Sequence, residues 1–163
     1  MKKILLFAMM IIVLASCATG KSAGQKEQRA AKYESQIADS INNRTLTVNF
    51  DFVNPLRFPA HHLTTTYSLK IKGDSISSYL PYFGRAYHAD YGSTDSPLSF
   101  NGHSEGMNIT KAKKDSYRIT FQTMKQQENF EYILTIFNNG KATLNVNSNE
   151  RDPISFDGEV EIN

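Results

Sequence analysis

The sequence predicts a mostly β protein, an antiparallel meander that forms a barrel or a sandwich, preceded by one N-terminal helix. Beyond Asn43, apolar and polar residues alternate with a period of two in a series of short runs. Several of these runs are separated by tight-turn sequences such as Asn138-Asn139-Gly140. No helical pattern follows Asn42, whereas parallel strands require long crossover connections. The strands are therefore antiparallel, and the pattern does not choose between barrel and sandwich.

The composition is that of one globular domain. The chain has 163 residues, of which 40% are hydrophobic and 21% are charged. Its 18 basic residues barely exceed its 16 acidic ones, so electrostatics predict no nucleic-acid partner. The single cysteine excludes a disulfide framework and a multi-cysteine metal cluster. We expect no cofactor and no metal site.

The first residues form an export signal. Lys2 and Lys3 precede an uncharged apolar run, residues 4–15, that is shorter than the ~20 residues needed to cross a bilayer. The run ends in Leu14-Ala15-Ser16-Cys17, which resembles a bacterial lipobox. The resemblance implies that residues 1–16 are removed as a lipoprotein signal peptide and that Cys17 is acylated, which anchors the protein to a membrane. The alternative is an ordinary secretory signal with an incidental cysteine.

The residues after the signal define the expected domain boundaries and the location. Residues 17–25 are small and polar, so we expect a lipidated flexible tether before a single β-rich domain over residues 26–163. By resemblance to lipoprotein sorting rules, the residue after the cysteine, which is Ala18 and not Asp, favours the outer membrane. The lack of an acidic run in residues 18–25 favours the side facing the periplasm.

Residues 26–42 have a helical pattern. Ala30, Tyr33, Ile37 and Ile41 recur at spacings of three and four, which places them on one face. Since this apolar stripe is narrow, we expect the helix to pack on the domain rather than to be stable alone.

About nine strands follow. In the first, Leu46, Val48, Phe50 and Phe52 alternate with polar residues, as in a strand with one buried face. The Asn139-Gly140 step predicts a type I′ hairpin turn. The other expected strands cover residues 67–71, 76–80, 98–100, 107–109, 117–121, 130–136, 142–146 and 154–162.

One motif suggests hydrolytic chemistry. Residues 102–106 read Gly-His-Ser-Glu-Gly and match the G-x-S-x-G pattern of serine hydrolases. That pattern works where a strand-to-helix turn lifts the serine above an α/β sheet, and the flanks here are strand-like. No histidine follows His103 to act as a downstream base. We therefore expect a polar turn and no catalytic residue, with a hydrolase based on Ser104 or on a histidine as the alternative.

The four histidines are expected in loops. His61 and His62 are adjacent and would point to opposite faces of a strand, so they would not chelate one ion together. His88-Ala89-Asp90 and His103 with Glu105 lack the spacing typical of zinc sites.

The segment 79–91 is the densest feature of the sequence. It combines five aromatic residues with Arg85 and His88. Tyrosine supplies a flat face and a hydroxyl, and arginine supplies a fork for a carboxylate or phosphate, so a protein or glycan could bind here. The alternative is that these rings plug one end of the sheet. The candidate binding residues are Tyr79, Tyr82, Arg85 and Tyr87.

Two stretches carry a family resemblance. Residues 71–76 (Ile-Lys-Gly-Asp-Ser-Ile) with 79–87 (Tyr-Leu-Pro-Tyr-Phe-Gly-Arg-Ala-Tyr), and residues 149–158 (Asn-Glu-Arg-Asp-Pro-Ile-Ser-Phe-Asp-Gly), resemble the signature of a family of Bacteroidetes lipoproteins of unknown function, domain-of-unknown-function family 4251. The resemblance covers the chain from about residue 37 onward and implies a mostly β fold with a lipid-anchored N-terminus. It implies no catalytic residue. The positions to mutate first are Tyr82, Gly84, Arg85, Arg151 and Gly158.

These observations favour a non-enzymatic binding or interaction module on the cell envelope, with the segment 79–91 as its contact surface. A hydrolase is one alternative. The other is a barrel that carries a small apolar ligand in its interior.

Overall fold

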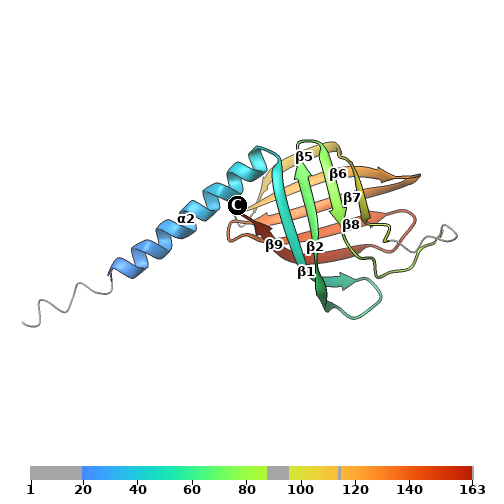
Figure 1. Ribbon diagram of the computed structural model, residues 1–163, viewed down its shortest axis with the longest axis horizontal. Helices are drawn as coiled ribbons and strands as arrows, with labels where there is room; N and C mark the ends of the chain where they lie inside the picture. The colour runs from blue at the N-terminus through green and yellow to red at the C-terminus, as the bar shows by residue number, and fades with distance from the viewer. Residues whose placement is uncertain (1–19, 88–95, 114, 163) are drawn as a thin grey trace, which may run out of the picture.

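A computed structural model describes residues 20–87, 96–113 and 115–162 of the chain (Figure 1). One helix, α2 (Gly20–Asn42), precedes nine strands. The strands are β1 (Thr45–Pro55), β2 (His61–Lys72), β3 (Ser75–Tyr79), β4 (Ser99–His103), β5 (Glu105–Ala112), β6 (Ser116–Lys125), β7 (Glu128–Phe137), β8 (Lys141–Ser148) and β9 (Ile154–Glu161). The prediction of a mostly β, antiparallel fold with one N-terminal helix is confirmed.

The nine strands form a nearly closed barrel. Their order in the sheet is β4-β3-β2-β1-β9-β8-β7-β6-β5, and every pair is antiparallel. The last strand, β9, pairs with the first strand, β1, and this pairing joins the two halves of the sheet into the barrel. Consecutive strands are neighbours everywhere else except between β4 and β5, which follow each other end to end. The fold is an up-and-down barrel rather than a sandwich.

The break between β4 and β5 is a corner in one long segment. His103 pairs with Ser75 of β3, whereas Glu105 pairs with Gln122 of β6. Gly106 has a φ of 63°, and the register of β5 shifts beside it, so a glycine bulge bends the segment from one neighbour to the other. Across the gap, the Lys125 ammonium donates to the carbonyls of Ser96 and Ser99 at 3.0 and 3.1 Å.

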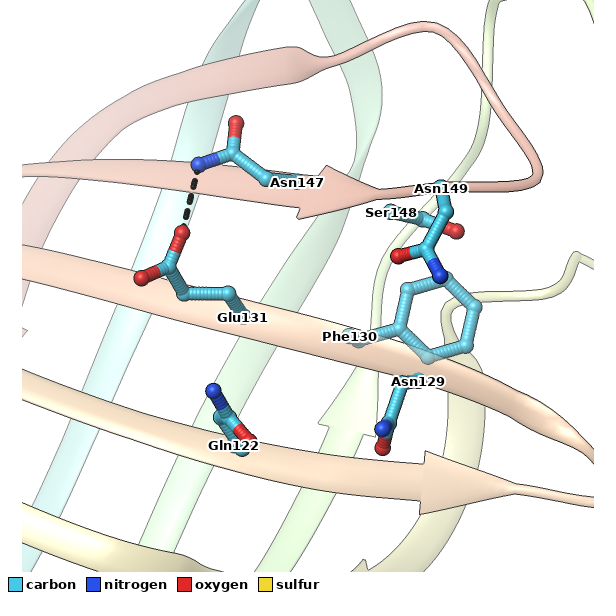
Figure 2. Close-up of a pocket in the computed structure, with 7 residues that line it drawn as sticks. All are labelled: Gln122, Asn129, Phe130, Glu131, Asn147, Ser148 and Asn149. Carbon is cyan, nitrogen blue, oxygen red and sulfur yellow. Dashed lines mark hydrogen bonds between the residues drawn. The ribbon is translucent and has the colours of Figure 1, made fainter.

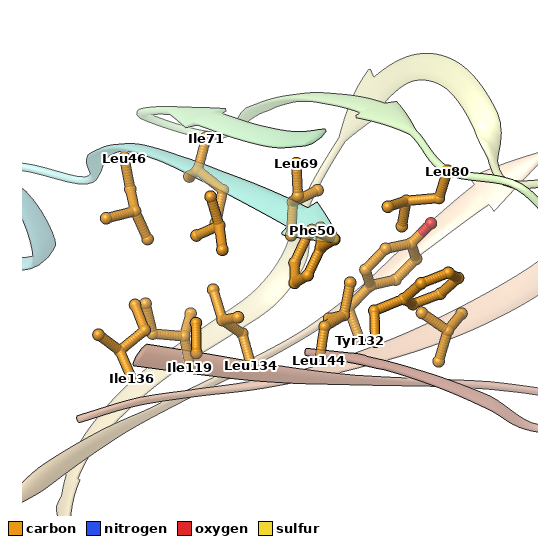
Figure 3. Packing of buried hydrophobic residues seen from close by; sticks show 14 of the residues in the cluster. Leu46, Phe50, Leu69, Ile71, Leu80, Ile119, Tyr132, Leu134, Ile136 and Leu144 are labelled. Carbon is orange, nitrogen blue, oxygen red and sulfur yellow. The ribbon is translucent and has the colours of Figure 1, made fainter. Parts of the chain in front are cut away.

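The interior of the barrel is packed with apolar side chains (Figure 3). Phe50 and Phe156 face each other from neighbouring strands with ring centroids 5.8 Å apart, and Phe121 stacks on Tyr132 at 5.0 Å. These rings and the surrounding aliphatic residues are almost completely buried. The inward positions of the strands therefore form a continuous hydrophobic core.

The predicted alternation along β1 is wrong at Phe52. Residues Leu46, Val48 and Phe50 point inward as expected, but a bulge at Asp51 shifts the register, and Val53 takes the next buried position. Phe52 instead lies half-buried beside His62, with the rings 4.8 Å apart. Gly158 faces this bulge, and a Cβ there would lie 2.0 Å from the Asn49 carbonyl oxygen. Only glycine fits this close approach.

The predicted hairpin between β7 and β8 is present, but its turn is not type I′. Type I′ needs positive φ at both central residues, whereas Gly140 (φ 85°) is the one residue of this turn with positive φ. The Gly140 amide donates to the Phe137 carbonyl at 2.9 Å, and Ile136 pairs with Ala142. The connection is therefore a turn over Phe137–Gly140 that ends in a left-handed glycine.

Helix α2 begins at Gly20, so residues 20–25 are helical rather than the expected flexible tether. The segment that follows is rich in Gln, Lys, Glu, Arg and Ala, all good helix formers, which explains the extension. Ile37 and Ile41 are buried against the barrel as predicted, whereas Ala30 is exposed. Only the C-terminal part of α2 packs on the domain, and the rest projects from it (Figure 1).

Within the described residues, no helix combines the length and apolarity needed to span a membrane. The predicted signal peptide, residues 1–16, and Cys17 lie outside the described residues.

Candidate functional site

The two ends of the barrel differ in what they expose. Helix α2 covers one end, and we call the opposite end, which carries the β1–β2, β3–β4, β6–β7 and β8–β9 connections, the distal end. All the exposed large hydrophobic side chains among the described residues lie on or beside these distal connections: Leu56, Phe58, Tyr79, Phe83, Tyr87 and Met124. The distal end is therefore the first place to search for a site.

A buried carboxylate organises the distal end. Asp152 is 2% exposed and lies in the β8–β9 connection. The Arg57 Nε donates to its Oδ2 at 2.9 Å, and the Tyr87 hydroxyl donates to its Oδ1 at 2.7 Å. The hydrogen bond from Tyr87 and the charge and hydrogen bond of Arg57 hold the pKa of Asp152 below its ordinary value, against the opposing effect of burial. Asp152 thereby ties the β1–β2 and β3–β4 connections together.

Backbone pairing fixes the segment around Arg85. The Arg85 amide donates to Asp152 Oδ2 at 3.3 Å, and the Asp152 amide donates to the Arg85 carbonyl at 3.0 Å. The Tyr87 amide donates to the Glu150 carbonyl at 2.7 Å, and Ala86 forms a β-bridge with Arg151. A short ladder therefore holds the two stretches of the family resemblance against each other.

Tyr82 anchors the same segment from inside. Its hydroxyl lies 2.9 Å from the Asp152 carbonyl and 3.1 Å from the Arg85 carbonyl, so its proton is shared between them. Burial, with a further contribution from the nearby Asp152 charge, raises the pKa of Tyr82 to about 12. A Cβ on Gly84 would collide with the Tyr82 ring and hydroxyl, which explains the glycine. Tyr82 therefore acts as a structural support.

Three arginines lie at the distal end, and two of them are paired with acids. Arg57 binds Asp152, and the Arg151 Nε lies 2.9 Å from both carboxylate oxygens of Glu128 while its guanidinium lies over the Tyr82 ring. Ser148 donates to the same Glu128 carboxylate at 2.6 Å. Arg85 is exposed, and its guanidinium has no hydrogen-bond or ion-pair partner among the described residues.

Alternate residues of the segment 82–87 face outward. Phe83, Arg85 and Tyr87 are exposed, whereas the residues between them are half-buried. The β1–β2 connection, which Arg57 joins to Asp152, adds three exposed residues, and the ring of His61, which follows it, packs edge-on against Phe83 with centroids 4.8 Å apart. We call the resulting patch the distal surface; it consists of Leu56, Arg57, Phe58, Phe83, Arg85 and Tyr87.

The structure brings three of the four candidate binding residues together. Tyr82 supports the segment, and Arg85 and Tyr87 project from it. Tyr79 lies apart on the outer face of β3, with its ring 5.3 Å from that of Tyr67. The segment thus combines both sequence interpretations, since some of its side chains close the barrel end and others point to solvent. His88, Asp90 and Tyr91 lie outside the described residues.

Sequence reasoning missed the groups that complete this patch. Leu56, Arg57 and Phe58 belong to a connection that the sequence analysis did not single out. Asp152 was part of the quoted family stretch but was not named as a site residue. An acidic residue between Arg151 and Pro153, directly ahead of a strand with alternating apolar residues, was the signal available for a buried carboxylate.

The G-x-S-x-G match lies at the corner between β4 and β5, not at a strand-to-helix turn. The Ser104 hydroxyl and amide both donate to the Asp74 carbonyl, at 3.2 and 2.8 Å. Glycine 106 serves the bulge, and Gly102 lies beside Thr123 across the gap. The motif therefore has a structural explanation.

Three of the four histidines expected in loops, His61, His62 and His103, lie in strands, and the fourth, His88, lies outside the described residues. His61 and His62 begin β2 and pack against different rings, Phe83 and Phe52, while His103 ends β4. Among the described residues, no group of three or more His, Cys, Asp or Glu side chains is arranged to hold a metal ion.

A second candidate is a polar hollow of about 360 Å³ on the outer face of β6–β8 (Figure 2). Amide side chains surround Glu131, which accepts a hydrogen bond from Asn147 Nδ2 at 2.9 Å. The lining side chains are Gln122, Asn129, Phe130, Glu131, Asn147, Ser148 and Asn149. Four polar members, Gln122, Asn129, Glu131 and Asn147, occupy outward positions of an antiparallel sheet, where polar residues are the rule. The hollow therefore does not by itself indicate a ligand.

The fold and the site together define a class: a small up-and-down β-barrel with a projecting N-terminal helix and an aromatic, arginine-containing surface at the far end. Residues 28–160 match the model of the family named "Domain of unknown function (DUF4251)", and the chain belongs to that family. The chain is also similar to the crystal structure of a DUF4251 family protein from Bacteroides eggerthii DSM 20697. That similarity has a TM-score of 0.58 at 14% identity and covers 80% of this chain and 87% of the other. No curated protein matches the chain.

Proposed function

We propose that this protein is a non-enzymatic binding module of the cell envelope and that the distal surface is its contact surface for another protein. One observation carries the proposal: four of the six exposed large hydrophobic side chains of the described residues belong to the distal surface, and the other two, Tyr79 and Met124, lie on strands beside the same end. Tyr, Phe and Arg are enriched at the centres of protein interfaces, and the distal surface consists of these types together with one Leu.

The proposal includes the lipid anchor at Cys17, with outer-membrane placement facing the periplasm. The lipobox resemblance supports the anchor. Helix α2 supports the arrangement, because its residues 24–32 are exposed, have no apolar stripe and would act as a polar spacer. Residues 20–32 would span about 20 Å at about 1.5 Å per residue. The anchor would then hold the α2 end towards the membrane and direct the distal surface away from it.

Photo-crosslinking in cells tests the contact surface. Benzoylphenylalanine replaces Leu56 on the distal surface in one full-length variant, and replaces Lys72, an exposed residue of the α2 end, in the matched control. We expect a discrete protein adduct from position 56 that disappears when Phe58→Ser and Phe83→Ser are added. The control position should give no such adduct.

Equal adducts from both positions, or an adduct from position 56 that survives both serine substitutions, would contradict the proposal. The anchor has its own test, because Cys17→Ser should release the protein from the membrane fraction and remove the acyl mass. The hydrolase alternative predicts that a fluorophosphonate probe labels Ser104, and such labelling would displace the binding role.

A further inference from the structure

We infer that Arg85 is the specificity residue of the distal surface and that it binds a carboxylate of the protein partner next to an apolar side chain. This inference rests on the proposed function. It goes further because it names the chemical group that the partner must present, a carboxylate, and the side chain that binds this group, Arg85.

The backbone of Arg85 is held firmly in place. Its amide and carbonyl both bond to Asp152, at 3.3 and 3.0 Å, and its carbonyl also lies 3.1 Å from the Tyr82 hydroxyl. The segment therefore has little backbone freedom to lose on binding. A side chain on a rigid backbone is pre-organised, which lowers the entropic cost of binding.

Two carboxylates of the distal end, Asp152 and Glu128, are already paired with groups other than the Arg85 guanidinium. Asp152 is already bound by Arg57, Tyr87 and the Arg85 amide, and Glu128 is bound by Arg151. Neither carboxylate needs the Arg85 guanidinium. Since Arg85 is exposed and has no partner among the described residues, its planar fork of donors is available to an acid from outside.

Arg85 lies between two exposed aromatic residues of the segment. Phe83 and Tyr87, which are 37% and 56% exposed, flank Arg85 on the outward side of the segment. When a partner's apolar side chain covers these rings, water is excluded from the guanidinium, and a charge-assisted hydrogen bond there becomes stronger than one in bulk water. An acid beside an apolar residue fits both features at once.

A protein segment fits this surface better than a glycan does. Glycan hydroxyls are held by amide and carboxylate side chains that surround an aromatic platform, and the distal surface has none exposed. The Asp152 carboxylate is buried, and the exposed amides of the distal connections, Gln126, Gln127 and Asn149, lie outside the six residues of the distal surface. The observations therefore favour a peptide carboxylate.

A peptide array probed with the full-length protein in detergent tests the inference. Each short peptide carries one Asp or Glu beside Leu or Phe, and a matched array replaces the acid by Asn or Gln. Three variants are compared with the wild type: R85Q, R85K and R118Q. Arg118 is the control, because it is an exposed arginine near the α2 end.

We expect the wild type to bind a subset of acidic peptides about tenfold or more tightly than their amide counterparts, and R85Q to lose that preference. R85K should retain only part of it, because lysine lacks the bidentate fork. R118Q should bind like the wild type.

An array without any acid-dependent binding, equal acid preference in R85Q and wild type, or equal losses in R85Q and R118Q would overturn the inference. These results are distinguishable from failure of the proposed function. A crosslink from position 56 that is sensitive to Phe58→Ser and Phe83→Ser but unchanged in R85Q refutes the carboxylate assignment and leaves the contact surface in place.

Discussion

At the α2 end of the barrel, apolar side chains are buried by a helix, whereas at the distal end they are exposed around a polar network. Ile37 and Ile41 of α2 are each 1% exposed, and short hairpin turns connect the strands there. At the distal end, longer connections are held by Asp152 and its hydrogen bonds, and Phe58 and Tyr87 remain more than half exposed.

The difference indicates how the molecule divides its tasks. Hydrophobic burial stabilises the α2 end, so the buried side chains there are not accessible to a partner. Hydrogen bonds to a buried carboxylate order the other end, which leaves its rings free to be displayed. A rigid support for exposed aromatic residues is what a binding surface requires.

The largest expected effect is on the α2 end. Ile37→Ala should lower the free energy of unfolding by about 2–5 kcal/mol, because it removes buried methyl groups and leaves a cavity between α2 and the barrel. Chemical denaturation measures the change. Ala30→Ser, on the exposed part of the same helix, is the control and should change little. A cost below about 1 kcal/mol for Ile37→Ala would mean that α2 is not part of the folded unit.

A smaller effect is expected at the hairpin under α2. Gly140→Ala should cost about 1–3 kcal/mol, since φ is 85° and the new Cβ would overlap the Tyr33 ring. Gly73→Ala is the matched control, because Gly73 also has positive φ (61°) but faces open space. The excess cost at Gly140 should vanish when Tyr33 is also changed to Ala. Equal costs at the two glycines in the presence of Tyr33 would contradict the packing described here.

The distal network should respond to acid. Because the folded-state pKa of Asp152 lies below its ordinary value of 3.8, its ionised form stabilises the fold. This stabilisation is fully present above the unfolded-state pKa and is lost as the pH falls through the folded-state pKa. The difference in unfolding free energy between wild type and Asp152→Asn should therefore be constant near neutral pH and shrink below about pH 4. A difference independent of pH would contradict the role of the charge.

The smallest stability effect among these is at Tyr82. Tyr82→Phe should cost about 0.5–1.5 kcal/mol, because the Asp152 carbonyl loses its donor. Tyr67→Phe is the control, because the half-buried Tyr67 ring packs against the core. The pKa of Tyr82 is raised to about 12, so the stabilisation by its neutral hydroxyl is complete below pH 10 and is lost as the pH rises through 12. The variant should therefore lack the part of the alkaline loss of stability that comes from the ionisation of Tyr82. Identical alkaline curves would contradict this.

Local patterns made most of the fold predictable. Alternation marked the inward residues Leu134, Ile136, Leu144 and Val146, and the helical spacing marked Ile37 and Ile41. The bulge at Asp51 was not predictable, because its cause is Gly158, which lies more than a hundred residues away and approaches it only in the sheet. For the same reason, the sequence left barrel and sandwich open. Closure depends on the pairing of β1 with β9.

The site was half predictable. Clustered aromatic residues and Arg85 identified the correct segment. Which of them support the segment and which face solvent depends on Asp152, some 65 residues further along the chain, and no spacing rule connects the two. Arg57 and Phe58 were missed because isolated residues in a connection carry no periodic signal.

The distal side chains are displayed and are not part of the core. The thermal unfolding of the Phe58→Ser, Phe83→Ser double variant, measured together with the crosslink from position 56, tests this arrangement. We expect a stability within about 0.5 kcal/mol per substitution of the wild-type value and loss of the crosslink. A loss of stability as large as that of Ile37→Ala would instead show that these rings hold the barrel together.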